Sequence, residues 1–318
     1  MRDEKTCAIL LAMGGPDNTH NVRRYLFNIF SDRSIIRLPG GPFLQKPLAW
    51  FISSARKGKV ASHYAMIGGG SPLFAWTDAQ RRRVEELLRS ELPGFRCFVG
   101  MRYFEPTIGE AVHRAFHEGF RRLIFIPMYP QYSRATTGSS FEEAGRQLAG
   151  YRGITSVFVR DYHDNPMYIS LLRDFIDANI RPGETLLFSA HSLPEKFVQD
   201  GDPYVEQIKR SAKLTAGGRD FHVAFQSRTG PVRWVQPETV SEVRRLLSSR
   251  PGGLFIVPIS FVCDHIETLY ELDIELREMV GPALAPRIRR MPMFNDDHRF
   301  AQVLANLIRE RVSARVTH

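Results

Sequence analysis

The sequence predicts an α/β protein made of two similar halves. Short apolar runs of strand length alternate with segments that carry apolar residues at helical spacing. Strands that are apolar along their whole length are typical of parallel sheets covered by helices on both faces. About four such strands precede residue 160 and about four follow it. We therefore expect two α/β domains, residues 1–160 and 161–318, with a cleft between them.

The composition is that of a globular protein. The 318 residues are 43% hydrophobic and 24% charged, and no apolar run approaches the roughly 20 residues of a membrane-spanning helix. The charged N-terminus is unlike a secretory signal. Cys7, Cys97 and Cys263 form no CxxC pair and no disulfide framework, which favours a reducing cytosol. The net charge of +9 suits an anionic substrate or membrane surface. Nucleic acid is disfavoured, since the basic residues are dispersed and no recognition module accompanies them.

Four strands and several helices are expected in the first half. The strands run from Cys7 to Met13, Phe95 to Met101, Arg122 to Met128 and Ile154 to Val159. The helices run from Val22 to Phe30, Thr77 to Leu92 and Glu110 to Phe120, and a further helix is expected to begin with a capping box at Ser139 or Ser140. Gly14 and Gly15 end the first strand, but they are not part of a GxGxxG motif and give little support to a nucleotide site.

Residues 35–76 differ from the rest of this half. Apolar residues are interleaved with cations, namely Leu38, Phe43, Leu44, Trp50 and Phe51 with Lys46, Arg56, Lys57 and Lys59. Such a segment can form the lip of a cleft that touches a lipid surface or admits an apolar anionic ligand. The alternative is an ordinary loop and helix packed on the core. Residues 67–73, with three consecutive glycines, must be tight and irregular.

His113 and His117 form a pair four residues apart on a predicted helix. Two imidazoles at this spacing can bind a metal ion. No third ligand is close in the sequence, so exposed histidines without a metal are the favoured interpretation.

Three strands and two long helices stand out in the second half. The strands run from Thr185 to Ala190, Phe221 to Gln226 and Leu254 to Ile259, and the helices from Pro166 to Ile180 and Arg299 to Val312.

The most informative stretch follows the third of these strands. It becomes polar at Asp264 and His265 and then continues with helical periodicity. Glu267, Glu271 and Glu275 fall four apart on one face, where like charges weaken a helix by about 0.2–0.5 kcal/mol per pair. A bound cation would offset this repulsion. A solvated acidic face is the alternative.

Strand ends indicate which side chains lie together. Ligands of parallel sheets bind outside the carboxyl ends of the strands. This rule places Met13, Tyr129, His191 and the polar turn 264–267 at one rim. We therefore expect His191 and Glu267 to face each other.

Several segments resemble those of the ferrochelatase family. Residues 187–194, LFSAHSLP, with Gly201-Asp202-Pro203-Tyr204 after them, resemble its signature, and residues 264–275 resemble its DHIETLYELDIE segment. Further matches are residues 67–73, 100–103, 129–133, 136–140 and 226–234. Together the motifs span residues 8 to about 295.

The resemblance implies a chelatase that inserts ferrous iron into a porphyrin, the last step of haem synthesis. It also implies two Rossmann-like domains with a porphyrin cleft between them and no nucleotide cofactor. Residues 35–76 would form the cleft lip of the first domain, and the second domain would carry the metal site.

The resemblance also assigns roles by motif. His191 and Glu267 match the family's catalytic and metal-site pair. Glu271 and Glu275 match the acidic row behind it, on a helix that is widened to π form in the family. Asp264 and His265 match supporting polar residues. The positions that match porphyrin contacts are Met13, Arg56, Tyr64, Ser71, Arg102, Tyr103, Trp234 and Phe261.

These residue types suit the chemistry. A porphyrin loses two pyrrole protons as the metal enters, and a neutral imidazole can accept a proton near pH 7. Imidazole and carboxylate also form a weak site for Fe²⁺. Whether His191 mainly accepts protons or binds metal stays open at this point.

The expected substrates are protoporphyrin IX and ferrous iron, because Met13-Gly14-Gly15-Pro16 resembles the protoporphyrin type of enzyme. A coproporphyrin III ferrochelatase, another tetrapyrrole chelatase and a non-catalytic porphyrin- or haem-binding protein are the alternatives. No tightly bound cofactor and no iron–sulfur cluster are expected, because Cys263 alone follows residue 97. The expected location is the cytoplasm, and peripheral contact with the inner face of a membrane is left open.

Overall fold

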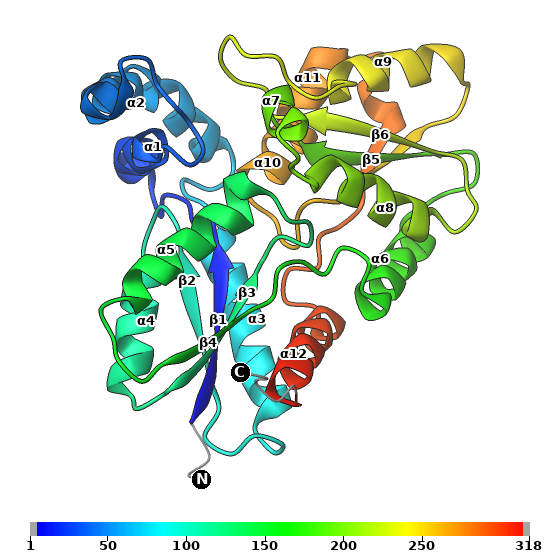
Figure 1. Ribbon diagram of the computed structural model, residues 1–318. Helices are drawn as coiled ribbons and strands as arrows, with labels where there is room; N and C mark the ends of the chain where they lie inside the picture. Colours follow the sequence, from blue (N-terminus) through cyan, green and yellow to red (C-terminus); the bar gives the residue numbers. More distant parts are fainter. Residues whose placement is uncertain (1–4, 314–318) are drawn as a thin grey trace. The chain divides into compact units, whose positions relative to one another are not determined.

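The chain forms two compact units, each built on one parallel sheet of four strands (Figure 1). The computed structural model describes residues 5–313. The first unit contains the residues up to Tyr129, Arg134–Asp161 and the residues from Asn295 onward, and the second contains Pro130–Ser133 and Tyr162–Phe294. The predicted α/β class with two parallel sheets is confirmed.

The first sheet has the strand order β2-β1-β3-β4. Its strands are β1 (Thr6–Ala12), β2 (Arg96–Met101), β3 (Arg122–Pro127) and β4 (Thr155–Phe158). Ile9 of the central strand β1 pairs with Phe98 on one side and Phe125 on the other. All three side chains are buried, as expected for a strand with helices on both faces.

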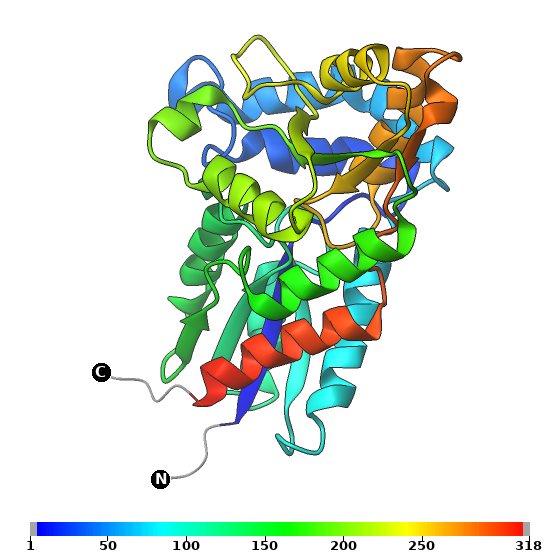
Figure 2. The same cartoon turned by 90° about the vertical axis from the view of Figure 1, so that its right-hand side faces the viewer.

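Helices cover both faces of this sheet. They are α3 (Leu73–Leu88), α4 (Ile108–His117), α5 (Ser139–Leu148) and α12 (His298–Ser313). The unit also contains η1 (Thr19–Asn21), α1 (Val22–Ser31) and α2 (Gly41–Met66), which pack on one another, and the π-helical η2 (Arg134–Gly138), which leads into α5. Val112 of α4 and Ala144 of α5 pack on alternate residues of β1. α3 and α12 lie side by side on the other face (Figure 2).

The last helix belongs to the first unit, whereas the expected second domain, 161–318, included it. Its apolar stripe is buried against the first unit, and polar contacts fix both of its ends. Gln80 donates a hydrogen bond to the carbonyl of Asn295 (2.6 Å), and Arg122 donates to the carbonyl of Arg311 (2.7 Å). Sequence order alone carries no sign of this return.

Residues 41–66 form one 26-residue helix, α2, which the sequence did not predict as such. Pro42 occupies the start of the helix, where its missing N–H has no intrahelical partner, and Pro47 is tolerated inside it. The buried amide of Gln45 joins α2 to the first unit by donating to the carbonyls of Phe30 and Ile36.

The predicted capping box at Ser139 or Ser140 is wrong. The π-helical turns of η2 run directly into α5, so Ser139 and Ser140 lie inside a continuous helical segment and no side chain caps the start of α5. A capping box does start α4, where Thr107 and Glu110 satisfy each other's backbone N–H groups.

The second sheet has the strand order β6-β5-β7-β8. Its strands are β5 (Thr185–His191), β6 (Phe221–Gln226), β7 (Leu254–Pro258) and β8 (Ile288–Arg290). The first three were predicted, but β8 has only three residues and gives no periodic signal. The carboxyl ends of β5 and β6 meet because His191 pairs with Gln226.

The helices of the second unit again lie on both faces of the sheet. They are α6 (Pro166–Asn179), α7 (Glu195–Gln199), α8 (Tyr204–Ala216), α9 (Thr239–Ser249), α10 (Ile266–Leu269), the π-helical η3 (Glu271–Glu275), α11 (Leu276–Val280) and η4 (Ala285–Arg287). Leu246 of α9 and Leu276 of α11 pack with Leu187 and Ile256 in one core cluster. This packing anchors the acidic stretch, which lies between β7 and α11. Across residues 5–313, the structure has no helix with the length and apolarity to span a bilayer.

Candidate active site

His191 is the last residue of β5 and is held by its backbone. Its N–H donates to Ser260 Oγ (3.1 Å), and its carbonyl accepts from the Tyr204 hydroxyl (3.0 Å). On the ring, Nδ1 lies 2.5 Å from the carbonyl of Ser192. Because a carbonyl can only accept, Nδ1 carries the proton. In the neutral ring Nε2 therefore has a free lone pair.

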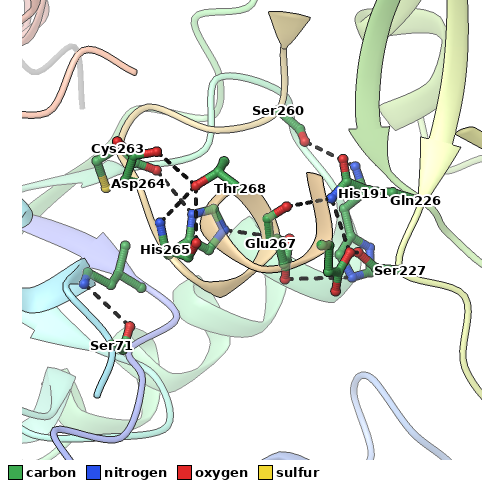
Figure 3. Close-up of polar contacts among 12 residues, drawn as sticks. Ser71, His191, Gln226, Ser227, Ser260, Cys263, Asp264, His265, Glu267 and Thr268 are labelled. Carbon is green, nitrogen blue, oxygen red and sulfur yellow. Dashed lines mark hydrogen bonds and ion pairs between the residues drawn. The ribbon is translucent and has the colours of Figure 1, made fainter. Parts of the chain in front are cut away.

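Glu267, in the first turn of α10, faces that lone pair. Its Oε1 lies 3.9 Å from His191 Nε2, and its Oε2 lies 3.6 Å from His265 Nε2, so the carboxylate sits between two imidazoles (Figure 3). Burial alone raises the pKa of Glu267, but the two histidines outweigh it and the pKa is lowered. Glu267 is ionised at neutral pH, and the predicted juxtaposition of His191 and Glu267 is confirmed.

His265 is fixed from both sides. Its Nδ1 lies 3.0 Å from the carbonyl of Cys263, and its backbone N–H donates to Thr268 Oγ1 (3.0 Å), whose hydroxyl donates to Asp264 (2.9 Å). Burial lowers the pKa of His265, but the hydrogen bond and charge of Glu267 outweigh burial and raise it. His265 thus holds Glu267 in place and compensates its charge, while Asp264 and Thr268 help to fix the turn that carries His265.

Glu271 has a different environment from Glu267. Gln226 Nε2 donates to its Oε2 (3.1 Å), and so does Ser227 Oγ. Gln226 also donates to the carbonyl of Glu267 (2.8 Å), which ties β6 to α10. Burial and the negative charge of Glu267 raise the pKa of Glu271 to about 7. Two carboxyls four residues apart therefore differ in charge at neutral pH.

The acidic stretch is π-helical from Glu271 to Glu275, as the family resemblance implied. Arg290, which ends β8, holds this segment with two hydrogen bonds to Asp273 (2.9 and 2.7 Å) and contacts Asp264 (3.1 Å). It thereby fixes the π segment to the turn that precedes α10. π segments are rare and frequently occur at functional sites.

Not every expected metal ligand is brought together. The described contacts join His191, Glu267 and Glu271, and Glu275 lies at the far end of the π segment. Within residues 5–313, no set of three or more His, Cys, Asp or Glu side chains has a geometry ready to hold a metal ion. The metal roles of these four residues remain predictions.

Four of the residues expected to contact porphyrin lie around Gly14 and Gly15 in the first unit. The Tyr103 amide donates to the carbonyl of Met13 (2.9 Å), and the Ser71 amide donates to that of Pro16 (2.7 Å). A Cβ atom at Gly15 would lie 2.5 Å from Ser71 Oγ and 3.7 Å from the Tyr64 hydroxyl. Only glycine allows these segments to come so close.

Arg102 and Tyr103 share one buried carboxylate. Asp32 accepts from Arg102 (2.6 Å), from the Tyr103 hydroxyl (2.6 Å) and from Ser139 Oγ (2.9 Å). Burial raises the pKa of Asp32, but these donors outweigh it and lower the pKa. Arg56, in contrast, is exposed on α2, with its guanidinium 5.7 Å from the centre of the Phe30 ring.

The two porphyrin candidates of the second unit lie near His265 and His191. The Phe261 ring packs edge-on against His265, with ring centroids 4.5 Å apart. Trp234 forms a bridge with Pro194, in the loop after His191, and its indole N–H is buried without a hydrogen-bond partner in the described part of the chain.

Sequence reasoning missed the residues that position the others. Tyr204 and Ser260 fix His191, while Gln226 and Ser227 fix Glu271. One signal was present for Gln226, because it ends a strand next to the one that ends at His191. Tyr204 and Ser260 come from a helix and a turn whose approach no local pattern indicates.

Comparisons with known proteins agree with this arrangement. The family model "Ferrochelatase" matches residues 5–312. A ferrochelatase of Geotalea uraniireducens is 43% identical over 321 residues, which cover 98% of this chain and 99% of that protein. A ferrochelatase of Picosynechococcus is 40% identical over 329 residues, with 98% and 85% covered.

Solved structures show the same fold at low sequence identity. SirB from Bacillus subtilis with Fe³⁺ matches with a TM-score of 0.55 and 12% identity, over 97% of this chain and 96% of that one. CbiX, described as the terminal enzyme of sirohaem biosynthesis in denitrifying bacteria, matches with a TM-score of 0.53 and 12% identity, over 97% and 99%. At this identity the likeness concerns the fold alone.

Proposed function

The chain belongs to the ferrochelatase family of lyases, which insert ferrous iron into a porphyrin in haem biosynthesis, and from this premise we propose that it metallates protoporphyrin IX at His191 and Glu267. The observation that supports this most is the pair itself. An imidazole with a free Nε2 lone pair lies 3.9 Å from an ionised carboxylate, at the end of a strand, where ligands of parallel sheets bind.

The residues fit the proton balance of the reaction. Ferrous iron replaces two pyrrole protons, so two protons leave the macrocycle for each ion that enters. His191 accepts one of them at Nε2, and the resulting imidazolium is stabilised by the adjacent Glu267 carboxylate. Glu271, with a pKa of about 7, is suited to take the second proton near neutral pH. His265 and Asp264 keep Glu267 oriented throughout.

The same atoms can bind the metal, but not at the same moment. Imidazole nitrogen and carboxylate oxygen suit Fe²⁺ and hold it weakly enough for release. Since Nε2 of His191 has one lone pair, it binds iron or takes a proton, and not both. We propose that proton acceptance is its main role, because its neighbour Glu267 already supplies the negative charge that attracts the cation.

The test is metal insertion by His191→Ala and His191→Gln. We expect both variants to lose insertion of Fe²⁺ into protoporphyrin IX while they bind the porphyrin almost as tightly as the original chain. His298→Ala, which removes an exposed histidine of α12, is the matched control and should keep full activity. An active His191→Ala enzyme would contradict the proposal.

The choice of protoporphyrin IX over coproporphyrin III rests on Met13, which follows β1 and precedes Gly14. Anaerobic insertion assays with both porphyrins decide it. A higher kcat/KM with coproporphyrin III would make the chain a coproporphyrin ferrochelatase, and insertion of other metals into other tetrapyrroles would point to a different chelatase.

We further propose that α2 contacts a membrane surface from the cytoplasmic side. Four large apolar side chains are exposed in its first half: Phe43 (92%), Phe51 (66%), Trp50 (53%) and Leu44 (49%). Its second half carries the exposed cations Arg56, Lys57 and Lys59. Apolar and basic residues together favour an anionic lipid interface. Vesicles with anionic lipid should therefore float more of the protein than neutral vesicles, and equal recovery would leave α2 without this role.

The proposed enzyme needs no resident cofactor, no iron–sulfur cluster and no nucleic-acid partner. Cys7, Cys97 and Cys263 are free, buried thiols, and burial raises the pKa of each above its ordinary value. Buried protonated thiols are poor metal ligands, which supports this part of the proposal. Iron analysis of the protein purified without porphyrin tests directly whether an iron–sulfur cluster is bound.

A further inference from the structure

Two exposed histidines on α4 lie in contact with each other. His113 and His117 are one helical turn apart, and their ring centroids are separated by 4.2 Å with 48° between the ring planes. Both belong to the first unit, whereas His191 and Glu267 belong to the second. The proposed chemistry makes no use of this pair.

One ring of the pair is oriented by a neighbour. His113 Nδ1 lies 3.0 Å from the Tyr151 hydroxyl, and the Tyr151 ring is held by Phe116 at a centroid distance of 4.7 Å. A hydrogen bond at one ring nitrogen leaves the other, Nε2, to face solvent. Metal-binding histidines are typically fixed in this way by a partner on the second nitrogen.

The charges around the pair tolerate a cation. Arg114, which lies between the histidines in sequence, is paired with Glu118 (2.8 Å). The guanidinium of Arg121 lies over the Phe116 ring and donates a hydrogen bond to the Phe116 carbonyl. His117 is the last residue of α4, where the helix dipole favours positive charge.

We propose that His113 and His117 bind one exchangeable divalent transition-metal ion through their imidazole nitrogens. Rings at 4.2 Å need only small side-chain rotations to place two nitrogens about 2.0–2.1 Å from one Zn²⁺ ion. Imidazole pairs select Zn²⁺, Ni²⁺, Cu²⁺ and Fe²⁺ over Mg²⁺ and Ca²⁺, which prefer oxygen ligands.

The site has two protein ligands, and water completes its coordination. The nearest acidic side chain along this face of the helix, Glu110, is turned to the Thr107 amide (2.7 Å) and hydroxyl (3.1 Å) in the capping box. The ion therefore stays exposed and exchanges readily, in contrast to a closed structural zinc site.

The test is equilibrium binding of Zn²⁺ to the full chain without porphyrin, measured in competition with a chromophoric chelator. We expect His113→Ala and His117→Ala each to bind one Zn²⁺ fewer than the original chain, or to bind it at least tenfold more weakly. His298→Ala, which removes an exposed histidine that contacts Gln302, should match the original chain. Mg²⁺ in excess should not displace the ion.

A second readout counts the ligands directly. Pulsed EPR of the chain with one equivalent of Cu²⁺ should detect two coordinated imidazoles, and one in either variant. Unchanged Zn²⁺ binding in both variants would overturn the proposal. So would a loss in only one of them, because a single histidine would then hold the ion. Thermal melting shows whether the substituted chains are folded. Only metal binding by folded variants is used to judge the proposed site.

Discussion

The replacement Glu271→Gln tests how the second unit controls the charge of its acidic segment. The amide has the size of the carboxyl group and keeps an oxygen that can accept from Gln226 and Ser227. What it removes is the charge, which in the folded protein faces the negative charge of Glu267 in a buried setting.

The magnitude follows from the pKa of Glu271, which is raised from 4.5 to about 7. Between these two pH values the folded chain binds more protons at this position than the unfolded chain. Its stability therefore falls as the pH rises through this range. Each tenfold change in proton affinity is worth about 1.4 kcal/mol, so the full cost above pH 7 is about 3 kcal/mol. Partial contact of the side chain with solvent lowers the expected value to about 1–3 kcal/mol.

The assay is urea unfolding of the original chain and of Glu271→Gln from pH 4.5 to 8, with a chelator present to exclude metal ions. We expect nearly equal free energies of unfolding at pH 4.5, where Glu271 is protonated in the folded chain and about half protonated in the unfolded chain, and a more stable variant at pH 8. Ser248→Ala, a change at an exposed position of α9, is the control and should preserve the pH dependence of the original chain. Parallel pH profiles for the original chain and Glu271→Gln would refute the reasoning.

Three further changes test other contacts. Arg290→Met should cost about 3 kcal/mol of stability, measured by urea unfolding, because it removes the cation that contacts both Asp264 and Asp273. The KM for Fe²⁺ should rise as well, and an unchanged KM would restrict Arg290 to a role in stability. Gly15→Ala should destabilise the folded chain by about 1–3 kcal/mol, since the new Cβ would lie 2.5 Å from Ser71. A melting temperature equal to that of the original chain would disprove this close approach. Thr107→Ala should lower the free energy of unfolding by about 0.5–2 kcal/mol, because α4 loses its cap, and metal insertion should continue unchanged. Reduced insertion by a folded variant would argue against a purely structural cap.

The sequence predicted the strands and the facing pair because both depend on local rules. Apolar runs mark β1 and β7, and strand ends mark the rim where His191 meets Glu267. The different protonation of Glu267 and Glu271 could not be predicted, because it depends on side chains that reach them from other elements.

Two local features differ from what the sequence indicated, for physical causes of the same kind. No helix bounds were predicted within residues 35–76, and residues 41–66 form one helix with Pro42 at its start and Pro47 accommodated inside it. Ser139 matched a capping box by spacing, but the preceding π turns satisfy the backbone and free its hydroxyl for Asp32. In both cases the neighbours of the segment decided between two conformations that its own sequence allows.

The return of α12 to the first sheet makes the first unit discontinuous in the chain. During synthesis, residues 162–294 leave the ribosome before the helix that completes the first unit is made. The second unit can therefore finish folding before the first, although the first begins earlier. One face of the first sheet lacks α12 during this interval, so its apolar side chains remain open to premature association until the last helix arrives.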